Sequence, residues 1–369
     1  MTSASIGVAV VGTGFGQKIH IPGFQIHHRT EVVAVYHRDR EKAQAIAQSH
    51  TIPHACQSLE EIVALPEVQA VSISTPPFLH YDMAKTALEA GKHLLLEKPM
   101  TLSATEAIAL HQLAIAHNVT AMMDFEFRFV PIWQRFAELL AEGYVGQKRF
   151  INVACLVSSR ADATRPWNWY SRKEQGGGML GAMGSHVFDY LTWLFAPVQR
   201  LCGRLSTTIP ARPDSATGEW QPVDADDACN LMLELTDGTL CQVTLSSVTY
   251  NGRGHWIEVY GDRGTLILGS DNQKDYVHGF KLWGGKAGEP LQELPVPDRL
   301  EFPKTYADGR LAPFLRVVDH WVKGIDEGRS PVPSLREGVY SQLLMDLTHQ
   351  SHQSSSWVEV PALDAVLRT

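Results

Sequence analysis

The chain has 369 residues, of which 44% are apolar, and it carries a formal net charge of −8 at pH 7. This length allows two hydrophobic cores, and the acidic balance argues against non-specific nucleic-acid binding and against docking on anionic membranes. No stretch reaches the about 18 uninterrupted apolar residues of a membrane span, and the N-terminus lacks the basic segment of a signal peptide. Five cysteines without Cys-x-x-Cys spacing indicate reduced thiols and a cytoplasmic protein.

The N-terminal third alternates short apolar runs with segments of helical periodicity. Nearly continuous apolar strands separated by helices are typical of a doubly wound parallel sheet, which we expect as a first domain over residues 1–124. The predicted strands are Ile6–Val11, Glu31–Tyr36, Val68–Ser74, His93–Leu96 and Thr120–Met123. The predicted helices are Lys18–His28, Arg40–Ser49, Tyr81–Ala90 and Thr101–His117.

After Pro131 the pattern changes to strand-like runs, and Asp237-Gly238 marks a hairpin turn. We expect a second, α+β domain over residues 125–369 with a mostly antiparallel sheet, and its last helices can pack back on the first domain. The predicted strands are Phe150–Val157, Leu201–Thr208, Cys229–Leu235, Thr239–Ser247, His255–Tyr260 and Gly264–Leu268. The predicted helices are Ile132–Glu142, Ser185–Leu194, Phe314–Gly324 and Glu337–Gln350, and residues 271–310 are expected to be mainly loop.

A glycine-rich turn lies where the first predicted strand gives way to a helix, at Gly12-Thr13-Gly14-Phe15-Gly16. Such glycines allow a tight turn and a close approach of the backbone to a pyrophosphate, while the helix N-terminus offers free N–H groups. Gln17 stands where the third glycine of G-x-G-x-x-G is usual, so the fingerprint is imperfect. We predict dinucleotide binding here, with a plain turn as the alternative.

The residues after the second strand predict which dinucleotide binds. NAD sites usually carry an acidic residue there for the ribose 2′-hydroxyl, but this chain has His37 and Arg38. A guanidinium suits a 2′-phosphate, so the sequence favours NADP over NAD. The alternative is that Arg38 is only solvated and Asp39 takes the role of the acid.

The segment Glu97-Lys98-Pro99 leaves the apolar strand His93–Leu96. Proline keeps the residue before it out of a helix, which presents Lys98 at the carboxyl edge of the sheet, where ligands of such sheets bind. Beside a nicotinamide ring, the lysine could transfer a proton or donate a hydrogen bond to a substrate hydroxyl. A surface lysine paired with Glu97 is the alternative.

A second candidate group follows a glycine-rich stretch, residues 176–184. We expect a helix to begin at about Ser185, a good N-cap, which would put His186 in the first helical turn. There the helix dipole would favour a neutral imidazole able to accept a hydroxyl proton. A buried structural histidine is the alternative.

Five motifs in this order resemble the Gfo/Idh/MocA family of NAD(P)-dependent oxidoreductases along nearly the whole chain. They are GTGFG, STPPFLH (74–80), LLLEKP, FRFVP (127–131) and GGGML…GSHVFD. The resemblance implies a Rossmann domain and a domain with a large open sheet, often used to form homodimers or homotetramers. It implies Lys98 and His186 as catalytic residues. The cofactor-binding residues would be Gly12, Thr13, Gly14, Phe15, Gly16, Gln17, His37, Arg38, Ser74, Thr75, Pro76, His80, Glu97 and Lys98.

One position departs from the family pattern. Ala182 stands four residues before His186, where the family usually has an aspartate. Asp189 and Tyr190 follow on the same helix face and could orient the imidazole, although a structural contact is the simpler reading of Asp189. The resemblance also suggests that Glu126, Arg128, Trp167 and Tyr170 contact a substrate, since aromatic faces with polar edges suit a sugar ring.

These observations predict an enzyme that moves a hydride between a nicotinamide cofactor and a small-molecule sugar, polyol or related secondary alcohol or ketone. Two alternatives stay open: a redox glycosidase with retained NAD, and a non-catalytic, cofactor-sensing regulator. No His-Glu-x-x-His motif or cysteine–histidine cluster predicts a metal site, and no Gly-x-Ser-x-Gly motif predicts a serine nucleophile.

Overall fold

The computed structural model describes residues 5–272, 275 and 278–368. Outside the described residues lie 1–4, 273–274, 276–277 and 369. Residues 1–4 belong to the segment expected to lack a signal peptide. The internal residues belong to the expected loop, and residue 369 is the expected end of the second domain. The chain divides into two compact units, Met1–Glu126 with Arg310–Gln342, and Phe127–Gly309 with Leu343–Thr369. The first unit thus includes a late segment of the chain in addition to the N-terminal part.

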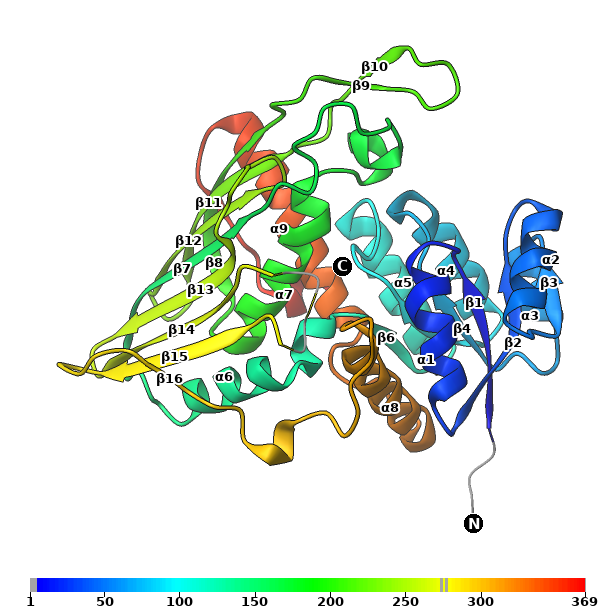
Figure 1. The fold of residues 1–369 in the computed structure, drawn as a ribbon, viewed down its shortest axis with the longest axis horizontal. Coiled ribbons are helices and arrows are strands. Elements are labelled where there is room, and N and C mark those ends of the chain that lie inside the picture. Colours follow the sequence, from blue (N-terminus) through cyan, green and yellow to red (C-terminus); the bar gives the residue numbers. More distant parts are fainter. Residues whose placement is uncertain (1–4, 273–274, 276–277, 369) are drawn as a thin grey trace. The chain divides into compact units, whose positions relative to one another are not determined.

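The first unit is built on a six-stranded parallel sheet in the order β3-β2-β1-β4-β5-β6 (Figure 1). Its strands are β1 (Ile6–Val11), β2 (Thr30–Tyr36), β3 (His54–Cys56), β4 (Ala70–Ile73), β5 (His93–Leu96) and β6 (Ala121–Met123). The strand order reverses between β1 and β4, and ligands of such sheets bind at this switch point. The predicted doubly wound sheet is confirmed.

Helices connect these strands. They are α1 (Ile21–Ile26), α2 (Arg40–Ser49), α3 (Leu59–Ala64), α4 (His80–Glu89) and α5 (Ala104–Ala116). The side chain of Ser103 accepts a hydrogen bond from the Glu106 backbone N–H and so fixes the start of α5, three residues later than predicted. The short pair β3 and α3 was missed, because a three-residue strand and a six-residue helix give little periodicity.

The late helix α8 (Leu311–Glu327) belongs to the first unit. Its Phe314 ring meets Phe24 of α1 edge-on at 5.5 Å between centroids, and both Arg29–Asp326 hydrogen bonds measure 2.9 Å. A hydrophobic contact therefore holds α8 on α1, and a two-pronged ion pair holds it on the residue that precedes β2.

The second unit is built on a nine-stranded mixed sheet in the order β16-β15-β14-β13-β7-β12-β11-β8-β17 (Figure 1). Its strands are β7 (Lys148–Leu156), β8 (Val198–Ser206), β11 (Ala228–Leu235), β12 (Leu240–Ser246), β13 (Gly254–Gly261), β14 (Gly264–Ser270), β15 (Lys281–Lys286), β16 (Gln292–Glu293) and β17 (Val358–Glu359). Adjacent strands are antiparallel except β7 and β12, so the predicted mostly antiparallel sheet is confirmed.

Burial alternates from residue to residue along the strands of this sheet, as expected when one of its two faces is covered. Along β11, buried residues alternate with more exposed ones, beginning at Cys229. The helices of this unit are α6 (Pro131–Ala141), α7 (Ser185–Leu194), α10 (Leu363–Val366) and the second part of α9 (Leu335–Ser354). The Ser351 hydroxyl of α9 accepts a hydrogen bond of 2.9 Å from the Gly203 N–H of β8, which ties that helix to the sheet.

Two features of this unit were not predicted. The described part of the segment 271–310 is mainly loop, as expected, but it also contains β15 and the edge strand β16, whose glycines and charges hid the strand pattern. A separate two-stranded sheet, β9 (Ala211–Pro213) with β10 (Trp220–Pro222), was also missed. The Asp237-Gly238 hairpin joins β11 to β12 as predicted, with Gly238 at a φ of +82°. Within the described part of the chain, every helix is too short or too polar to cross a membrane.

Candidate active site

The glycine turn after β1 forms a cradle against the end of β4. Gly12 has a φ of +123°, and a Cβ there would lie 2.6 Å from the Ser74 carbonyl oxygen. A Cβ on Gly16 would collide with the Ser74 hydroxyl, whereas one on Gly14 would meet no atom within 4 Å. Glycine is therefore required for packing at Gly12 and Gly16, and the open space beside Gly14 fits the approach of a pyrophosphate.

The end of β2 has a defined hydrogen-bond pattern. The Asp39 carboxylate accepts from the Lys42 N–H at 3.2 Å and caps α2, and His37 Nδ1 accepts from the Asp39 N–H at 2.9 Å. Arg38, between them, is exposed. Asp39 therefore serves as the N-cap of α2, and the Arg38 side chain beside it lies at the surface.

Lys98 lies just beyond the end of β5, as expected. The Glu97 N–H donates to the Ile73 carbonyl of β4 at 2.9 Å. The Lys98 N–H donates to Oε2 of Glu97, the residue before it, at 3.2 Å. The Lys98–Pro99 peptide bond is cis. Lys98 and the glycine cradle thus lie at the carboxyl ends of β5 and β1, two strands of one sheet with only β4 between them.

His80 links two of the predicted cofactor segments. Its Nε2 lies 2.8 Å from the Thr75 carbonyl oxygen, and its Nδ1 lies 2.9 Å from the Pro99 carbonyl oxygen. Burial lowers the pKa of His80, and the two carbonyls act in the opposite sense. The ring is fully buried, so its role here is to hold the loop after β4 against the residue that follows Lys98.

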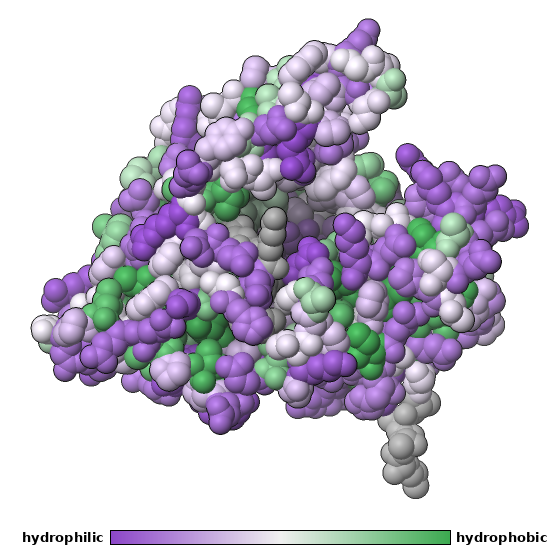
Figure 2. Space-filling model, in the orientation of Figure 1, coloured by the Kyte–Doolittle hydropathy of each residue, from purple (hydrophilic) through white to green (hydrophobic). Residues whose placement is uncertain are grey.

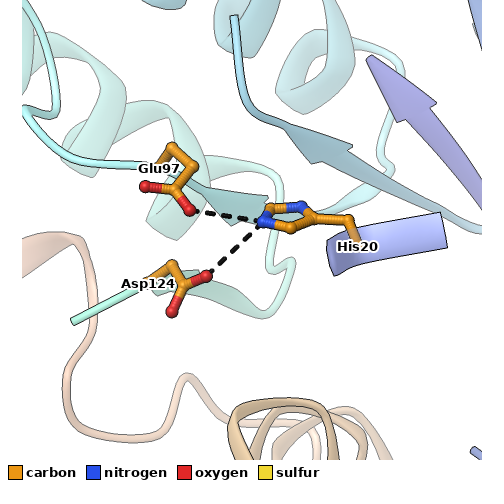
Figure 3. Close-up of side chains that lie close together, drawn as sticks. All are labelled: His20, Glu97 and Asp124. Carbon is orange, nitrogen blue, oxygen red and sulfur yellow. Dashed lines mark hydrogen bonds and ion pairs between the residues drawn. The ribbon is translucent and has the colours of Figure 1, made fainter. Parts of the chain in front are cut away.

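Three side chains, His20, Glu97 and Asp124, converge in a cluster that sequence reasoning only partly anticipated (Figure 3). His20 Nε2 lies 3.2 Å from Glu97 Oε1 and 3.6 Å from Asp124 Oδ2, and His20 Nδ1 lies 2.8 Å from the Ser72 hydroxyl. Glu97 was predicted, but His20 and Asp124 were not. The available signal was position, since Asp124 directly follows β6 just as Glu97 follows β5.

The cluster is strongly charged. Burial opposes protonation of His20, but hydrogen bonding and the charges of Asp124 and Glu97 raise its pKa to about 9. Burial and the neighbouring charge of Glu97 raise the pKa of Asp124 to about 7. Burial alone would raise the pKa of Glu97, yet hydrogen bonding to His20 and the charges of His20 and Lys98 lower it.

The same three ligating atoms lie within 4.8 Å of one another, as metal ligands do. However, one imidazole nitrogen faces both carboxylates at hydrogen-bond and ion-pair distances, an arrangement that a single proton on His20 satisfies. We therefore read the cluster as an ion triad. Glu126 is a further buried carboxyl group of this unit, and burial together with the charges of Asp124 and Glu97 raises its pKa to about 8.

His186 lies in a helix of the second unit, but the expected helix start is wrong. A π-helical turn, Leu180–Gly184, runs directly into α7, so Ser185 is inside a continuous helix. The Ser185 hydroxyl donates to the Gly181 carbonyl at 2.7 Å instead of capping. The helix begins near Met179, where Asp226 accepts hydrogen bonds from the Leu180 N–H with its side chain and from the Met179 N–H with its carbonyl. The dipole argument for His186 therefore does not apply.

The His186 ring is nearly buried and packs edge-on against Phe127, with 4.8 Å between centroids. Of the two residues considered for orienting it, Asp189 binds the Arg128 guanidinium through three hydrogen bonds of 2.6–3.2 Å. Tyr190 places its hydroxyl 3.1 Å from His255 Nε2. Asp189 thus makes a structural contact, and Arg128, a predicted substrate contact, is its partner.

Arginine side chains stack on aromatic rings of the segment 167–170, which precedes the glycine stretch. Arg160 stacks on the Tyr170 ring at 3.8 Å from its centroid, and burial raises the pKa of Tyr170 to about 12. Trp167 donates through Nε1 to the Pro222 carbonyl at 2.9 Å. Both predicted substrate residues lie on the loop between β7 and α7 and retain partial exposure.

Comparisons with known proteins agree with this geometry. Residues 6–125 match an oxidoreductase family with an NAD-binding Rossmann fold, and residues 137–360 match the C-terminal alpha/beta domain of the same family. The chain is 56% identical over 366 residues to an uncharacterized oxidoreductase of Synechocystis sp., covering 99% of each.

More distant relatives have described activities. The chain is 26% identical to levoglucosan dehydrogenase of Pseudarthrobacter phenanthrenivorans, covering 88% of each. A solved structure of levoglucosan dehydrogenase without ligand superimposes with a TM-score of 0.89 at 24% identity, covering 97% of this chain and 99% of that one, and so shares the fold. The protein therefore belongs to the Gfo/Idh/MocA oxidoreductase family, with its NAD-binding Rossmann domain and its C-terminal alpha/beta domain.

Proposed function

We propose that this protein transfers a hydride between a bound nicotinamide cofactor and a sugar, polyol or related secondary alcohol or ketone. One observation carries the proposal: the glycine cradle and Lys98 lie at the carboxyl edge of the same parallel sheet, on either side of β4. The nicotinamide supplies the redox chemistry, and the protein contributes binding, orientation and proton transfer.

Lys98 and His186 are the proposed catalytic residues. Oxidation of a secondary alcohol releases a hydroxyl proton when the carbon-bound hydride leaves, and a nearby amine or imidazole nitrogen can take it up. Lys98 Nζ and the imidazole of His186 offer such nitrogens. Ala182 supplies no carboxylate, and the carboxylate of Asp189 binds the Arg128 guanidinium.

The substrate class is proposed from the aromatic loop and from relatives. Trp167 and Tyr170 offer partly exposed rings of the kind that bind sugar faces, and Glu126 offers a buried carboxyl group that can bind a hydroxyl. Arg128 would act indirectly, through its bond to Asp189. A relative acts on levoglucosan, and solved levoglucosan dehydrogenase complexes contain NADH with levoglucosan or L-sorbose.

NADP is the proposed cofactor in preference to NAD. The exposed guanidinium of Arg38 follows β2, while the acid that would hold a ribose hydroxyl, Asp39, caps α2. His37 would line the same end of the sheet. Ser74, Thr75 and Pro76, which follow β4, and the turn residues Thr13, Phe15 and Gln17 complete the proposed cofactor contacts.

We further propose a cytoplasmic homodimer or homotetramer. Leu240, Phe150 and Tyr260 face one another across neighbouring strands and expose 52%, 36% and 37% of their surface. Figure 2 shows hydrophobic residues interspersed among hydrophilic ones in the region of the large sheet. An apolar row on an open sheet suits a second copy of the chain, and five free cysteines suit a reducing compartment.

Fluorescence titration with NADPH and NADH tests the cofactor site. A substrate screen should then follow the absorbance of the reduced nicotinamide that forms from NADP⁺ or NAD⁺. The substrates to test are levoglucosan, myo-inositol, glucose and sorbitol. Lys98→Ala and His186→Ala should abolish turnover while still binding cofactor, and Lys85→Ala, an exposed lysine of the same unit, is the control.

The same experiment separates the alternatives. A glycoside cleaved without net change of cofactor would indicate the redox glycosidase. Cofactor binding without turnover of any substrate would favour the regulator, and absence of cofactor binding would refute the proposal.

A further inference from the structure

The ion triad of His20, Glu97 and Asp124 has a consequence for the cofactor beyond its binding. We propose that Glu97 and Asp124, held in place by His20, determine which redox state of the nicotinamide binds more tightly: their negative charge favours the oxidised, positively charged ring over the reduced, neutral ring. This inference rests on the proposed cofactor site in the first unit.

The position of the triad supports this role. Glu97 follows β5 and Asp124 follows β6, on the far side of β4 from the strands that carry the glycine cradle and Arg38. A dinucleotide bound across the switch point has its adenosine half over β1 and β2, which leaves the nicotinamide half over β4 and β5. Glu97 is 12% exposed, whereas His20 is fully buried and Asp124 is 2% exposed, so Glu97 is the member at the edge.

The surroundings fix the geometry of the triad. The His20 ring stacks on Phe314 of α8 at 4.4 Å between centroids and meets Phe15 and Phe24 edge-on. On its other sides it faces the Ser72 hydroxyl of β4 and the two carboxylates. These rings pack around the imidazole, whose Nε2 is directed at Glu97 and Asp124. His20 is therefore a positioning residue.

The charge of the triad exceeds what His20 can neutralise. Both Asp124 carboxylate oxygens are buried and accept no hydrogen bond from the residues that the structure describes. One imidazolium between two carboxylates leaves net charge −1 when both are ionised and zero when Asp124 is protonated. Lys98 acts electrostatically on Glu97, and Lys98 and Arg310 act on Glu126, the further carboxyl group that the charges of Asp124 and Glu97 also reach.

Asp124 makes the preference depend on pH. Its pKa of about 7 means that the triad gains its extra negative charge as the pH rises through neutrality. Attraction to the positively charged ring should strengthen over the same range, while the affinity for the neutral reduced ring should change little. The ratio of the dissociation constants, reduced over oxidised, should therefore rise with pH.

Isothermal titration with NADP⁺ and NADPH, and with NAD⁺ and NADH, at pH 6 and pH 8 tests the proposal. For the unaltered protein we expect the ratio to increase several-fold between the two pH values. Glu97→Gln should lower the ratio on the order of tenfold at both pH values, because a charge is lost near the ring. Asp124→Asn should remove the pH dependence, whereas His20→Gln, which removes a hydrogen bond and a charge that lower the pKa of Asp124, should move the dependence to higher pH.

Asp319→Asn is the matched control, because it removes a carboxylate that also binds a histidine of this unit, His27 at 3.0 Å, but is 64% exposed. Asp319→Asn should leave the ratio unchanged. A ratio that is the same in the unaltered protein, Glu97→Gln and Asp124→Asn would overturn the proposal, as would a stoichiometric divalent metal in elemental analysis. If the unaltered protein bound none of the four cofactors, that result would instead refute the proposed function.

Discussion

The guanidinium of Arg128 and the carboxylate of Asp189 form a nearly buried ion pair, with side chains 9% and 3% exposed and a shortest contact of 2.6 Å. The pair joins the 3₁₀ turn after β6 to α7, the helix that carries His186. Because the guanidinium approaches through two nitrogens, the pair fixes the rotation of α7 within the second unit.

Asp189→Asn should therefore destabilise the protein by about 3–5 kcal/mol, because the Arg128 charge would stay buried without its partner. Urea unfolding followed by circular dichroism measures this loss. The control is Glu234→Gln, whose partner Arg200 is 43% exposed, and it should cost less than about 1 kcal/mol. Equal losses for the two variants would show that burial of the Arg128 pair is unimportant.

Alanine substitutions in the glycine turn should separate folding from cofactor binding. Gly14→Ala should fold normally, since its Cβ meets no atom within 4 Å, but it should weaken dinucleotide binding by at least tenfold because the methyl group occupies the approach of the pyrophosphate. Gly12→Ala, at a φ of +123° and against Ser74, should lower the melting temperature. Unchanged cofactor affinity in Gly14→Ala would contradict the assigned cradle.

Arg38→Ala should weaken NADPH binding by roughly 10- to 100-fold and leave NADH binding nearly unchanged, since a charge-assisted contact to phosphate is lost. Fluorescence titration measures both affinities. Arg40→Ala, which removes an exposed arginine two residues further on, is the control. Equal weakening of NADPH and NADH would mean that Arg38 does not read the 2′-phosphate.

The buried acid–histidine cluster should make stability fall as the pH rises. The pKa of Asp124 is about 7 in the folded protein against an ordinary 3.8, so its contribution is fully present below pH 3.8 and lost as the pH rises through 7. The pKa of His20 is about 9 against 6.5, so its contribution is present below pH 6.5 and lost as the pH rises through 9.

Asp124→Asn should flatten this dependence, because an amide does not titrate. Unfolding free energies at pH 5 and pH 9 should differ by about 1–3 kcal/mol less than in the unaltered protein. Asp319→Asn, which changes the 64% exposed carboxylate beside His27, should retain the full dependence. An equally steep loss of stability in Asp124→Asn would show that Asp124 is not the titrating group.

Much of the first unit follows from local sequence. Its β strands are continuous apolar runs, and Ser58, Asp39 and Ser103 each cap the helix that follows them, so periodicity and capping locate most elements. The positions of the glycine turn and of Lys98 follow from the same pattern. The longer strands of the second unit, β7, β8 and β11 to β14, were found for an equally local reason, the period-two alternation of apolar and polar residues along several of them.

Other features depend on residues far apart in the chain. Asp226 caps the helix before His186 from the loop before β11, and α8 joins the first unit through Phe24 and Phe314. No local pattern shows which distant group will satisfy a helix start or cover a hydrophobic face. For this reason Ser185 was wrongly predicted as the N-cap.

The sequence by itself determined the family, the parallel sheet and the place of Lys98, because these depend on short motifs and on the order of strands. Only the tertiary structure decided that His20 and Asp124 meet Glu97, although the three residues are separated by long stretches of chain. Their convergence comes from parallel strands ending at one edge of a sheet. Burial opposes every charge in the cluster, and hydrogen bonding and charge pairing among the three residues raise the pKa of His20 in spite of it.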